Sequence, residues 1–246
     1  MPLKIIYQDE SLLIVDKPPG IVCFPEGKSL EKESVIKNLI SSFPDLAKVG
    51  IAPRYGVIHR LDKDTSGLLM VAKSNAALPY FQKALQAREI EKKYLTLLVG
   101  KVKQNTGTID ALIGRSPNNR TKQACFLPLG PDAGKKGLRS ALTEYRKLKD
   151  LNGFTLVEAS PKTGRKHQLR VHFSFIGHPL AGDKTYGHKN QSAPEGLSRQ
   201  FLHAHYLKIK FPSGETREFS CPLPEDLQKV VDILELKSQE NHDFKS

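Results

Sequence analysis

The chain has 246 residues, and with 39% of them hydrophobic it can bury a substantial core, so disorder is not the expected state. Lys and Arg number 38 against 26 Asp and Glu, and the formal net charge of +12 favours a polyanionic partner, although many basic proteins simply carry a solvated positive surface. No apolar run reaches the roughly 18 to 20 residues of a membrane span, and the first residues lack a signal-peptide pattern. A cytoplasmic protein is therefore expected.

Strands are predicted where short apolar runs lie between turns rich in Gly, Pro or Asn. They cover residues 11–16, 57–61, 68–73, 94–99, 140–148, 154–159 and 207–211. The dipeptide Asn152-Gly153 is the clearest hairpin signal, because both residues tolerate the left-handed backbone of a two-residue turn.

Four helices are predicted from apolar spacing and from end signals. They span residues 34–43, 76–88, 166–176 and 225–236. Ser34 can cap the first helix, Pro79 is tolerable only in the first turn of the second, and Gly177 ends the third.

These elements predict an α+β fold, with a mostly antiparallel mixed sheet core and flanking helices. No internal repeat or low-complexity linker divides the sequence. One domain is expected over residues 1–237, followed by a polar, frayed tail over residues 238–246.

The three cysteines, Cys23, Cys125 and Cys221, are far apart and odd in number, which predicts neither a disulfide framework nor a metal knuckle. Basic residues are more informative, because they crowd into expected loops rather than spreading along helix faces. Those loops span residues 115–122, 135–139 and 162–170. A folded surface that gathers them would form a groove able to follow phosphates.

Residues 56–73 place Asp62 and Arg60 between two apolar runs. The runs are predicted strands, and the Asp-Thr-Ser-Gly between them is a turn. A side chain at the end of a strand can meet a ligand while the scaffold holds it, so the segment is typical of an active-site loop. For a lone Asp, a turn cap paired with Arg60 would be the simpler interpretation.

The complete sequence of this segment favours the active-site interpretation over the turn cap. Residues 59–68, His-Arg-Leu-Asp-Lys-Asp-Thr-Ser-Gly-Leu, match every named position of the signature His-Arg-Leu-Asp-x-x-Thr-Ser-Gly-Leu, and the chain thereby resembles the RluA family of pseudouridine synthases. Residues 163–172 and 177–187 are similar to the family's later blocks, with Leu169 for Ile and Lys166 for Thr as mild departures. Looser matches at residues 9–20 and 89–95, the latter resembling a Lys-x-Tyr element, extend the likeness over almost the whole chain.

The resemblance implies an RNA pseudouridine synthase, which detaches uracil from its ribose and reattaches it through carbon, without a cofactor or a metal. It implies Asp62 as the catalytic carboxylate, Arg165 as the residue that pairs with Asp62 and keeps it ionised, and Tyr94 as the residue that stacks on the base and assists proton transfer. Alone, Arg165 could be an ordinary surface residue and Tyr94 a half-buried core residue. Whether Asp62 attacks the sugar, attacks the base or starts an elimination stays open.

A uridine in folded RNA must be turned out of its stack before its glycosidic carbon can be reached. The resemblance implies Arg60 as the wedge that fills the gap, with a structural salt bridge as the alternative. The other candidates for substrate binding are polar residues of the two blocks, namely His59, Thr65, Lys166, His167 and Arg170. The spacing of His167 and His172 is not that of a helical zinc site, so no metal is expected, and Asp183 is expected to shape a loop.

Many family members carry a small basic S4 RNA-binding domain ahead of the catalytic part, whereas here the first catalytic strand is expected almost at Met1. The resemblance therefore implies a short form, in which the catalytic domain itself must grip ribosomal (large subunit) or transfer RNA. A monomer is also implied. Two other interpretations remain. A non-catalytic RNA-binding relative is disfavoured by the intact Asp62, Arg165 and Tyr94, and a nucleoside or glycoside hydrolase would usually need a pair of carboxylates.

Overall fold

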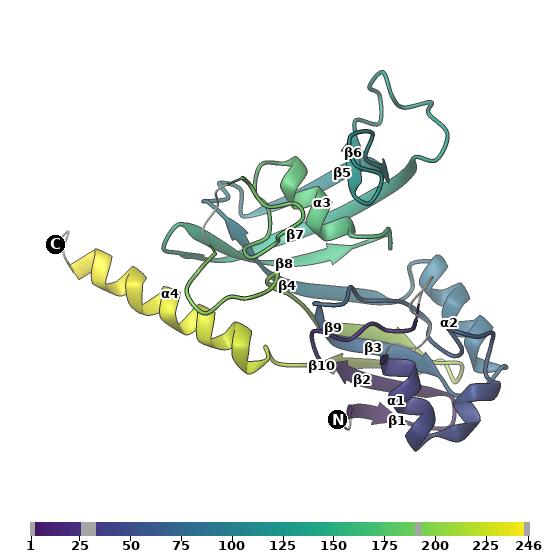
Figure 1. The fold of residues 1–246 in the computed structure, drawn as a ribbon. Coiled ribbons are helices and arrows are strands. Elements are labelled where there is room, and N and C mark those ends of the chain that lie inside the picture. Colours follow the sequence, from purple (N-terminus) through teal and green to yellow (C-terminus); the bar gives the residue numbers. More distant parts are fainter. Residues whose placement is uncertain (1–2, 26–32, 190–192, 244–246) are drawn as a thin grey trace. The chain divides into compact units, whose positions relative to one another are not determined.

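Figure 1 shows the computed structural model, which describes residues 3–25, 33–189 and 193–243. The chain separates into two compact units, each built from two stretches of sequence. Met1–Lys92 and His203–Pro222 form the first unit, and Lys93–Leu202 and Leu223–Ser246 form the second. The single domain expected over residues 1–237 stays a prediction. Among the helices that the structure describes, none combines the length and the apolar composition that a membrane crossing requires.

The first unit is built on strands whose centre is completely buried. Strands β1 (Lys4–Gln8), β2 (Leu12–Lys17) and β3 (Ser66–Ala72) pair in antiparallel order. All seven residues of β3 are buried, and so are five of the six in β2, because both strands are almost continuously apolar. Residues at such strand ends are held on a rigid support, and the signature segment leads directly into β3.

Strands β9 (Leu202–Lys210) and β10 (Thr216–Ser220) complete this unit from the far end of the sequence. The start of β9 pairs in parallel with the start of β3, through Ser66 with His203 and Gly67 with Ala204. Its later part pairs antiparallel with β10. The helices of the unit are α1 (Val35–Ser42), the 3₁₀ helix η1 (Pro44–Lys48) and α2 (Ala77–Gln86).

Aromatic packing joins the edges of the first unit. The Tyr7 ring on β1 lies 5.0 Å from the Phe219 ring on β10 and 5.8 Å from that of Phe211, measured between centroids. Phe211 also lies 6.0 Å from Phe81 on α2, in an edge-to-face arrangement. Such contacts are favourable for aromatic pairs, so the terminal strands and α2 are held to one core.

The second unit is an antiparallel sheet with two helices. Its strands pair in the order β4 (Glu91–Val99), β8 (Phe154–Pro161), β7 (Arg139–Leu151), β5 (Thr106–Arg115) and β6 (Gln123–Phe126). Helices α3 (Gln168–Phe175) and α4 (Glu225–Asp243) belong to the same unit. One core cluster packs the apolar residues of α4 against the sheet: Leu97, Leu151, Ala181, Phe201, Leu227, Val230, Val231 and Leu234.

Most sequence predictions agree with this structure. The α+β class is confirmed, and the four predicted helices and six of the seven predicted strands are present within a few residues. Asn152 and Gly153 have φ of 39° and 84°, as the predicted hairpin turn between β7 and β8 requires. Helix α4 is longer than expected, because it continues through Asp243 into the segment predicted to be a frayed tail.

The predicted strand over residues 57–61 is wrong, because side chains take hydrogen bonds that a strand would use. Arg54 donates from Nε to the carbonyl of Val57 at 2.9 Å and from Nη2 to that of Ile58 at 2.5 Å. His59 Nε2 accepts from the backbone N–H of Met70 at 3.2 Å. The Ile58 N–H donates to the Met70 carbonyl at 3.1 Å and the Ala72 N–H to the Gly56 carbonyl at 2.8 Å, so the pairing with β3 is limited to an isolated bridge between Val57 and Val71. Strands β1, β5, β6 and β10 were not predicted.

Gly67 is required where β9 meets β3. Its φ of 110° is unfavourable for other residues, and a Cβ there would lie 2.2 Å from the carbonyl oxygen of Ala204. Gly67→Ala is therefore expected to destabilise the protein by roughly 2 to 4 kcal/mol, measured by urea unfolding.

The matched control is Gly214→Ala, which shares a positive φ of 87° but has no atom within 4 Å of the added Cβ. It isolates the backbone cost, expected at about 1 kcal/mol. Equal losses of stability in the two variants would show that the contact with Ala204 is not what requires glycine.

Candidate active site

Asp62 lies in a tight turn whose backbone is fixed on both sides. Lys17, completely buried at the end of β2, donates from Nζ to the carbonyls of Pro18, Ile21 and Lys63 at 2.8, 2.8 and 2.9 Å. The N–H of Gly20 donates to the same Lys63 carbonyl at 2.9 Å. Two hydrogen bonds therefore hold the carbonyl of Lys63, the residue after Asp62. The buried ammonium is tolerated because it is hydrogen-bonded three times.

The peptide before Asp62 is fixed by a thiol. The backbone N–H of Leu61 donates to Cys23 Sγ at 3.2 Å, and the thiol lies 3.4 Å from the Leu61 carbonyl oxygen. Burial raises the pKa of Cys23, so the thiol stays protonated. Thr65 N–H closes the turn on the carbonyl of Asp62 at 3.1 Å. The Asp62 side chain is only half-buried, so a rigid backbone presents an accessible carboxylate.

The two residues that open the signature have opposite environments. His59 is buried, and desolvation with the nearby Lys92 and Arg54 charges lowers its pKa to about 3. It is neutral, and its Nε2 is occupied by the Met70 N–H. This packing favours a role in holding the loop over the predicted contact with substrate.

Arg60 is exposed, and its guanidinium lies 5.5 Å from the centroid of the Phe24 ring. The guanidinium of Arg54 lies 5.6 Å from the same centroid. A cation near an aromatic ring is attracted to its face, so Phe24 restricts where Arg60 can point. An exposed, planar and oriented cation fits the predicted wedge.

Thr65 is 1% exposed, and its Oγ1 has no hydrogen-bond partner among the described residues. Its backbone N–H closes the Asp62 turn, but the hydroxyl does not reach the surface. The predicted role of Thr65 in substrate binding therefore stays untested.

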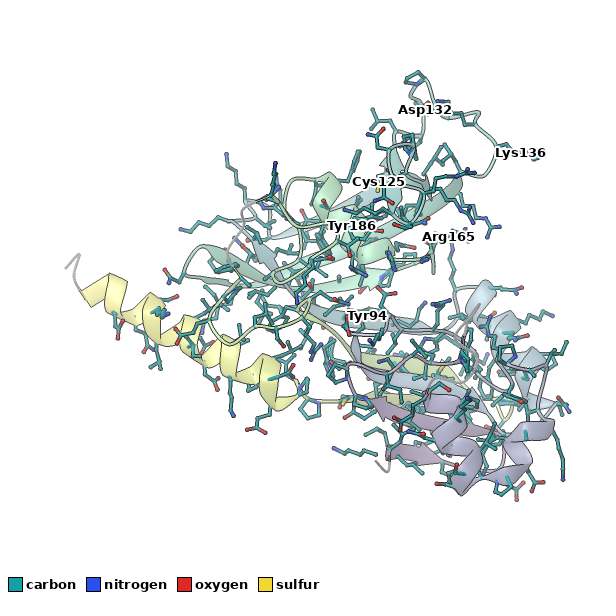
Figure 2. All side chains as sticks on the ribbon, viewed as in Figure 1. Tyr94, Cys125, Asp132, Lys136, Arg165 and Tyr186 are labelled. Atoms are coloured by element: carbon teal, nitrogen blue, oxygen red, sulfur yellow. The ribbon has the colours of Figure 1, made fainter. Side chains whose placement is uncertain are left out.

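Tyr94 lies on β4, opposite Ala159 of β8, and is 8% exposed. It belongs to the second unit with Arg165, whereas Asp62 belongs to the first. The proximity of these three side chains stays a prediction. Figure 2 shows Tyr94 and Arg165 on the second unit, projecting from a strand and from a loop before α3.

Gln168 fixes the turn that carries Arg165. Its Oε1 accepts from the Arg165 N–H at 3.0 Å and from Thr163 Oγ1 at 2.7 Å. Its Nε2 donates to the carbonyl of Leu142 and to Thr143 Oγ1, both at 3.0 Å. Arg165 Nε itself donates to the carbonyl of Ser140 at 3.0 Å. A buried amide thus sets the geometry of the turn, and the guanidinium remains partly exposed.

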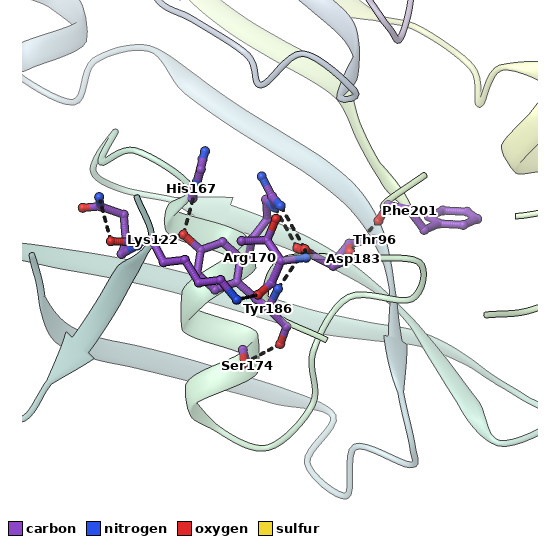
Figure 3. A network of polar contacts seen from close by, with 10 residues as sticks. Thr96, Lys122, His167, Arg170, Ser174, Asp183, Tyr186 and Phe201 are labelled. Atoms are coloured by element: carbon purple, nitrogen blue, oxygen red, sulfur yellow. Dashed lines mark hydrogen bonds and ion pairs between the residues drawn. The ribbon is translucent and has the colours of Figure 1, made fainter. Parts of the chain in front are cut away.

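Lys166 and His167 follow in the same turn but differ in how far they are exposed. Lys166 is exposed, as a phosphate contact would need. His167 has a left-handed backbone, with φ of 56°, and precedes helix α3. Its Nδ1 lies 2.8 Å from the hydroxyl of Tyr186 (Figure 3). His167 is half-buried, so its other ring edge can still face a ligand.

Arg170 lies in a buried ion pair, and its predicted role in substrate binding stays a prediction. Arg170 is 7% exposed and forms a bidentate ion pair with Asp183, with Nε to Oδ2 at 2.7 Å and Nη2 to Oδ1 at 2.9 Å (Figure 3). Its guanidinium carbon also lies 5.1 Å from the Tyr186 ring centroid. The bidentate pair and the burial give Arg170 a structural role in this loop.

Asp183 shapes the loop after α3, as predicted. Its Oδ1 accepts from the backbone N–H groups of Thr185 and Tyr186 at 2.9 and 3.0 Å. Burial alone would raise its pKa, but the Arg170 charge and these hydrogen bonds hold the pKa below its usual value. Lys122 Nζ donates to the Thr185 carbonyl at 2.7 Å and ties the β5–β6 connection to the loop.

The sequence did not single out Lys17, Cys23, Phe24 or Gln168. Lys17 carried a signal, since a lysine at the end of an apolar run and before Pro-Pro-Gly must either reach solvent or find acceptors. The other three act through contacts distant in sequence or through their neighbours' backbone. Across the described residues, no group of three His, Cys, Asp or Glu side chains could hold a metal ion.

The sequence matches the family model described as RNA pseudouridylate synthase over residues 11–175. It is 39% identical over 240 residues to the Ribosomal large subunit pseudouridine synthase D of Nitrosomonas europaea, covering 95% of this chain and 66% of that protein. The protein of the same name from Escherichia coli is 35% identical over 255 residues, covering 99% of this chain and 74% of that one. The chain thus spans about two thirds to three quarters of these relatives.

Two solved human structures are similar in fold. RNA Pseudouridylate Synthase Domain Containing 1 gives a TM-score of 0.73 at 30% identity, covering 93% of this chain and 87% of that one. RNA Pseudouridylate Synthase Domain Containing 4 gives 0.74 at 26% identity, covering 94% and 92%.

His172 on α3 makes folding sensitive to acid. It is fully buried, neither ring nitrogen has a hydrogen-bond partner among the described residues, and burial lowers its pKa to about 4 against an opposing effect of Asp110. In the unfolded chain the pKa is about 6.5. Between these values only the unfolded chain binds the proton, so stability present above about pH 6.5 is lost as the pH falls toward 4, by up to about 1.4 kcal/mol per unit.

Urea unfolding of the wild type and of His172→Gln between these pH values tests this. The glutamine variant is expected to lose less stability than the wild type over the same interval, since it cannot take up the proton. Parallel stability curves for the two proteins would contradict the assignment.

Proposed function

Because the chain belongs to the RNA pseudouridylate synthase family, we propose that it isomerises specific uridines to pseudouridine in RNA, with large-subunit ribosomal RNA as the first substrate to test. The names of its relatives from Nitrosomonas europaea and Escherichia coli support that choice. Transfer RNA is the alternative substrate. The protein is proposed to act in the cytoplasm as a monomer, with catalysis carried by residues 1–237.

The observation that supports this most strongly is the presentation of Asp62. The backbone is fixed at Leu61 by Cys23 and at Lys63 by Lys17, and Asp62 between them is half-buried within the complete signature. In the proposed reaction the bond from the ribose to uracil nitrogen breaks and a bond to the 5-carbon forms, which releases the 5-hydrogen as a proton. The net reaction needs no oxidant, reductant or added group, so protein side chains suffice.

Substrate handling is assigned to the cations around this turn. Arg60, exposed and oriented by Phe24, is proposed as the wedge that replaces the flipped uridine in the stack. Arg165 is proposed to pair with Asp62, and Tyr94 to stack on the base. Lys166 and His167 are proposed RNA contacts, since both remain at least partly exposed.

A basic surface on the second unit supports RNA as the partner. Residues 115–139 contain six Lys or Arg and one acidic residue. Of the six, Arg115, Arg120, Lys135, Lys136 and Arg139 are exposed. Figure 2 shows the segment with Asp132 and Lys136 extending beyond the ends of the strands of its unit. An extended basic loop can follow a phosphate backbone without reading bases.

The substrate can be found by mapping pseudouridine in total RNA with carbodiimide adducts read out by reverse transcription. Cells lacking the gene are compared with cells complemented by wild type or by Asp62→Asn. Sites in ribosomal RNA that vanish on deletion and return only with the wild type would establish activity and substrate together. An unchanged map would favour a non-catalytic RNA-binding protein, or a second enzyme that modifies the same sites.

Asp62→Asn is expected to lower the rate of pseudouridine formation at least about a thousandfold, because the amide cannot replace an ionised carboxylate. The hydrogen bond from the Thr65 N–H to the Asp62 carbonyl is unchanged by the substitution, so the turn should be kept. Release of tritium from RNA labelled at the uracil 5-carbon measures the rate. The control is Asp64→Asn, which removes a carboxylate from the same turn and should keep most of the activity.

RNA affinity is expected to fall steeply with salt, with a slope of about 0.7 to 0.9 in log Kd against log salt for each neutralised phosphate. The double variant Arg120→Gln, Lys136→Gln should lower that slope by about 1 to 2. Lys229→Gln, on the exposed face of α4 and paired with Glu225, is the control and should leave the slope unchanged. Equal slopes in all three proteins would exclude the loop as an RNA contact.

A further inference from the structure

Lys92 stands out among the lysines of the described chain as a half-buried cation beside the signature. It is the second residue of β4 and lies two positions before Tyr94, so the two side chains leave the strand on the same face. No hydrogen bond or ion pair to its Nζ is found within the described residues. The ammonium has therefore lost part of its hydration without receiving an acceptor.

The adjacent lysine shows the contrast. Lys93 leaves the opposite face of β4, and its Nζ lies 3.7 Å from the Glu158 carboxylate, whose side chain is 14% exposed. Lys93 thus has a protein counter-ion, and Lys92 does not. The two neighbouring lysines therefore differ in whether the described residues supply a counter-ion. A site for an anionic ligand needs a cation without one, and Lys92 meets that condition.

Lys92 shares its surroundings with the first residue of the signature. Burial first, and then the charges of Lys92 and Arg54, lower the pKa of His59, so the three side chains lie near one another. Burial also lowers the pKa of Lys92 itself to about 8. Burying an uncompensated cation is unfavourable, and such groups concentrate where a ligand completes the site.

We propose that Lys92 binds a backbone phosphate of the target nucleotide and so positions the flipped uridine next to the signature. This inference rests on the proposed function, because the phosphate belongs to the RNA substrate. Phosphate is the group of an RNA nucleotide that carries a full negative charge, and a compact ammonium on a flexible stem is a common partner for it. The neutral uracil ring offers no comparable charge before the reaction begins.

The proposal has a pH signature. Only the protonated amine binds phosphate, so affinity should fall as the pH rises from about 7 to about 9 through the pKa of the free enzyme. Neither neighbour changes charge in that interval, since His59 has a pKa of about 3 and Arg54 stays protonated. Arginine at position 92 would stay charged and would bind without this pH dependence.

The experiment uses the full chain and an unmodified transcript of large-subunit ribosomal RNA, tritiated at the uracil 5-carbon. Single-turnover rates at increasing enzyme concentration give the maximal rate and the half-saturating concentration. We expect Lys92→Met to raise half-saturation about tenfold and to keep the maximal rate within about twofold. Lys92→Arg should stay close to wild type at pH 7 and lose the rise in half-saturation toward pH 9. Lys93→Met is the matched control and should resemble wild type at both pH values.

Three results would overturn the proposal. Half-saturation could be the same in Lys92→Met as in wild type, the maximal rate could fall with half-saturation unchanged, or Lys93→Met could lose as much affinity as Lys92→Met. If the wild type released no tritium from any RNA, the proposed function would fail instead. The same variants in a direct binding titration of the transcript at both pH values would then decide the role of Lys92 separately, and Lys92→Arg carries the pH test if the methionine variant misfolds.

Discussion

The hydrogen bonds of Lys17 are the constraint on which the signature turn of the first unit depends. One buried ammonium joins three carbonyls, two from the turn after β2 and one from Lys63 in the signature turn, 46 residues from Lys17 along the chain. Lysine is rarely buried completely, and here three acceptors replace its hydration. The backbone of the turn is thus held by hydrogen bonds that do not use the Asp62 carboxylate, at the Lys63 and Leu61 positions on either side.

In the second unit, a neutral amide and a buried ion pair hold the backbone, where the first unit uses a buried lysine. The neutral amide of Gln168 accepts two hydrogen bonds and donates two, and it joins the Arg165 turn to the neighbouring strand β7. Arg170 and Asp183 then fix the loop after α3 by a buried ion pair supported by two backbone amides. In both units a cation or amide that looks suited to substrate is committed to structure. Arg60 and Lys166 remain exposed. The hydrogen bonds that hold their turns are made by the residues next to them in the chain.

The sequence predicted what local pattern determines and missed what tertiary contacts determine. Buried strands such as β3, the capped helix α1 and the Asn-Gly hairpin follow from periodicity and turn chemistry, so they were found. Residues 57–61 have strand composition, but Arg54 and His59 take up their hydrogen-bonding groups, which no local pattern shows. The ion pair of Arg170 was missed for the same reason, because its partner Asp183 is distant in sequence and a motif match does not show which guanidinium is paired.

Charge explains why an enzyme that would act on a polyanion can present a carboxylate. An isolated Asp would repel the RNA backbone, but exposed Arg60 and the half-buried Lys92 belong to the same unit as Asp62, and the chain carries an excess of positive charge overall. Cations at different depths can act on different parts of a nucleotide. An exposed guanidinium oriented by Phe24 suits a stacked base, whereas a less hydrated ammonium suits a phosphate held close to the protein. Depth of burial, rather than charge alone, would then separate residues that open the RNA from those that hold the opened nucleotide.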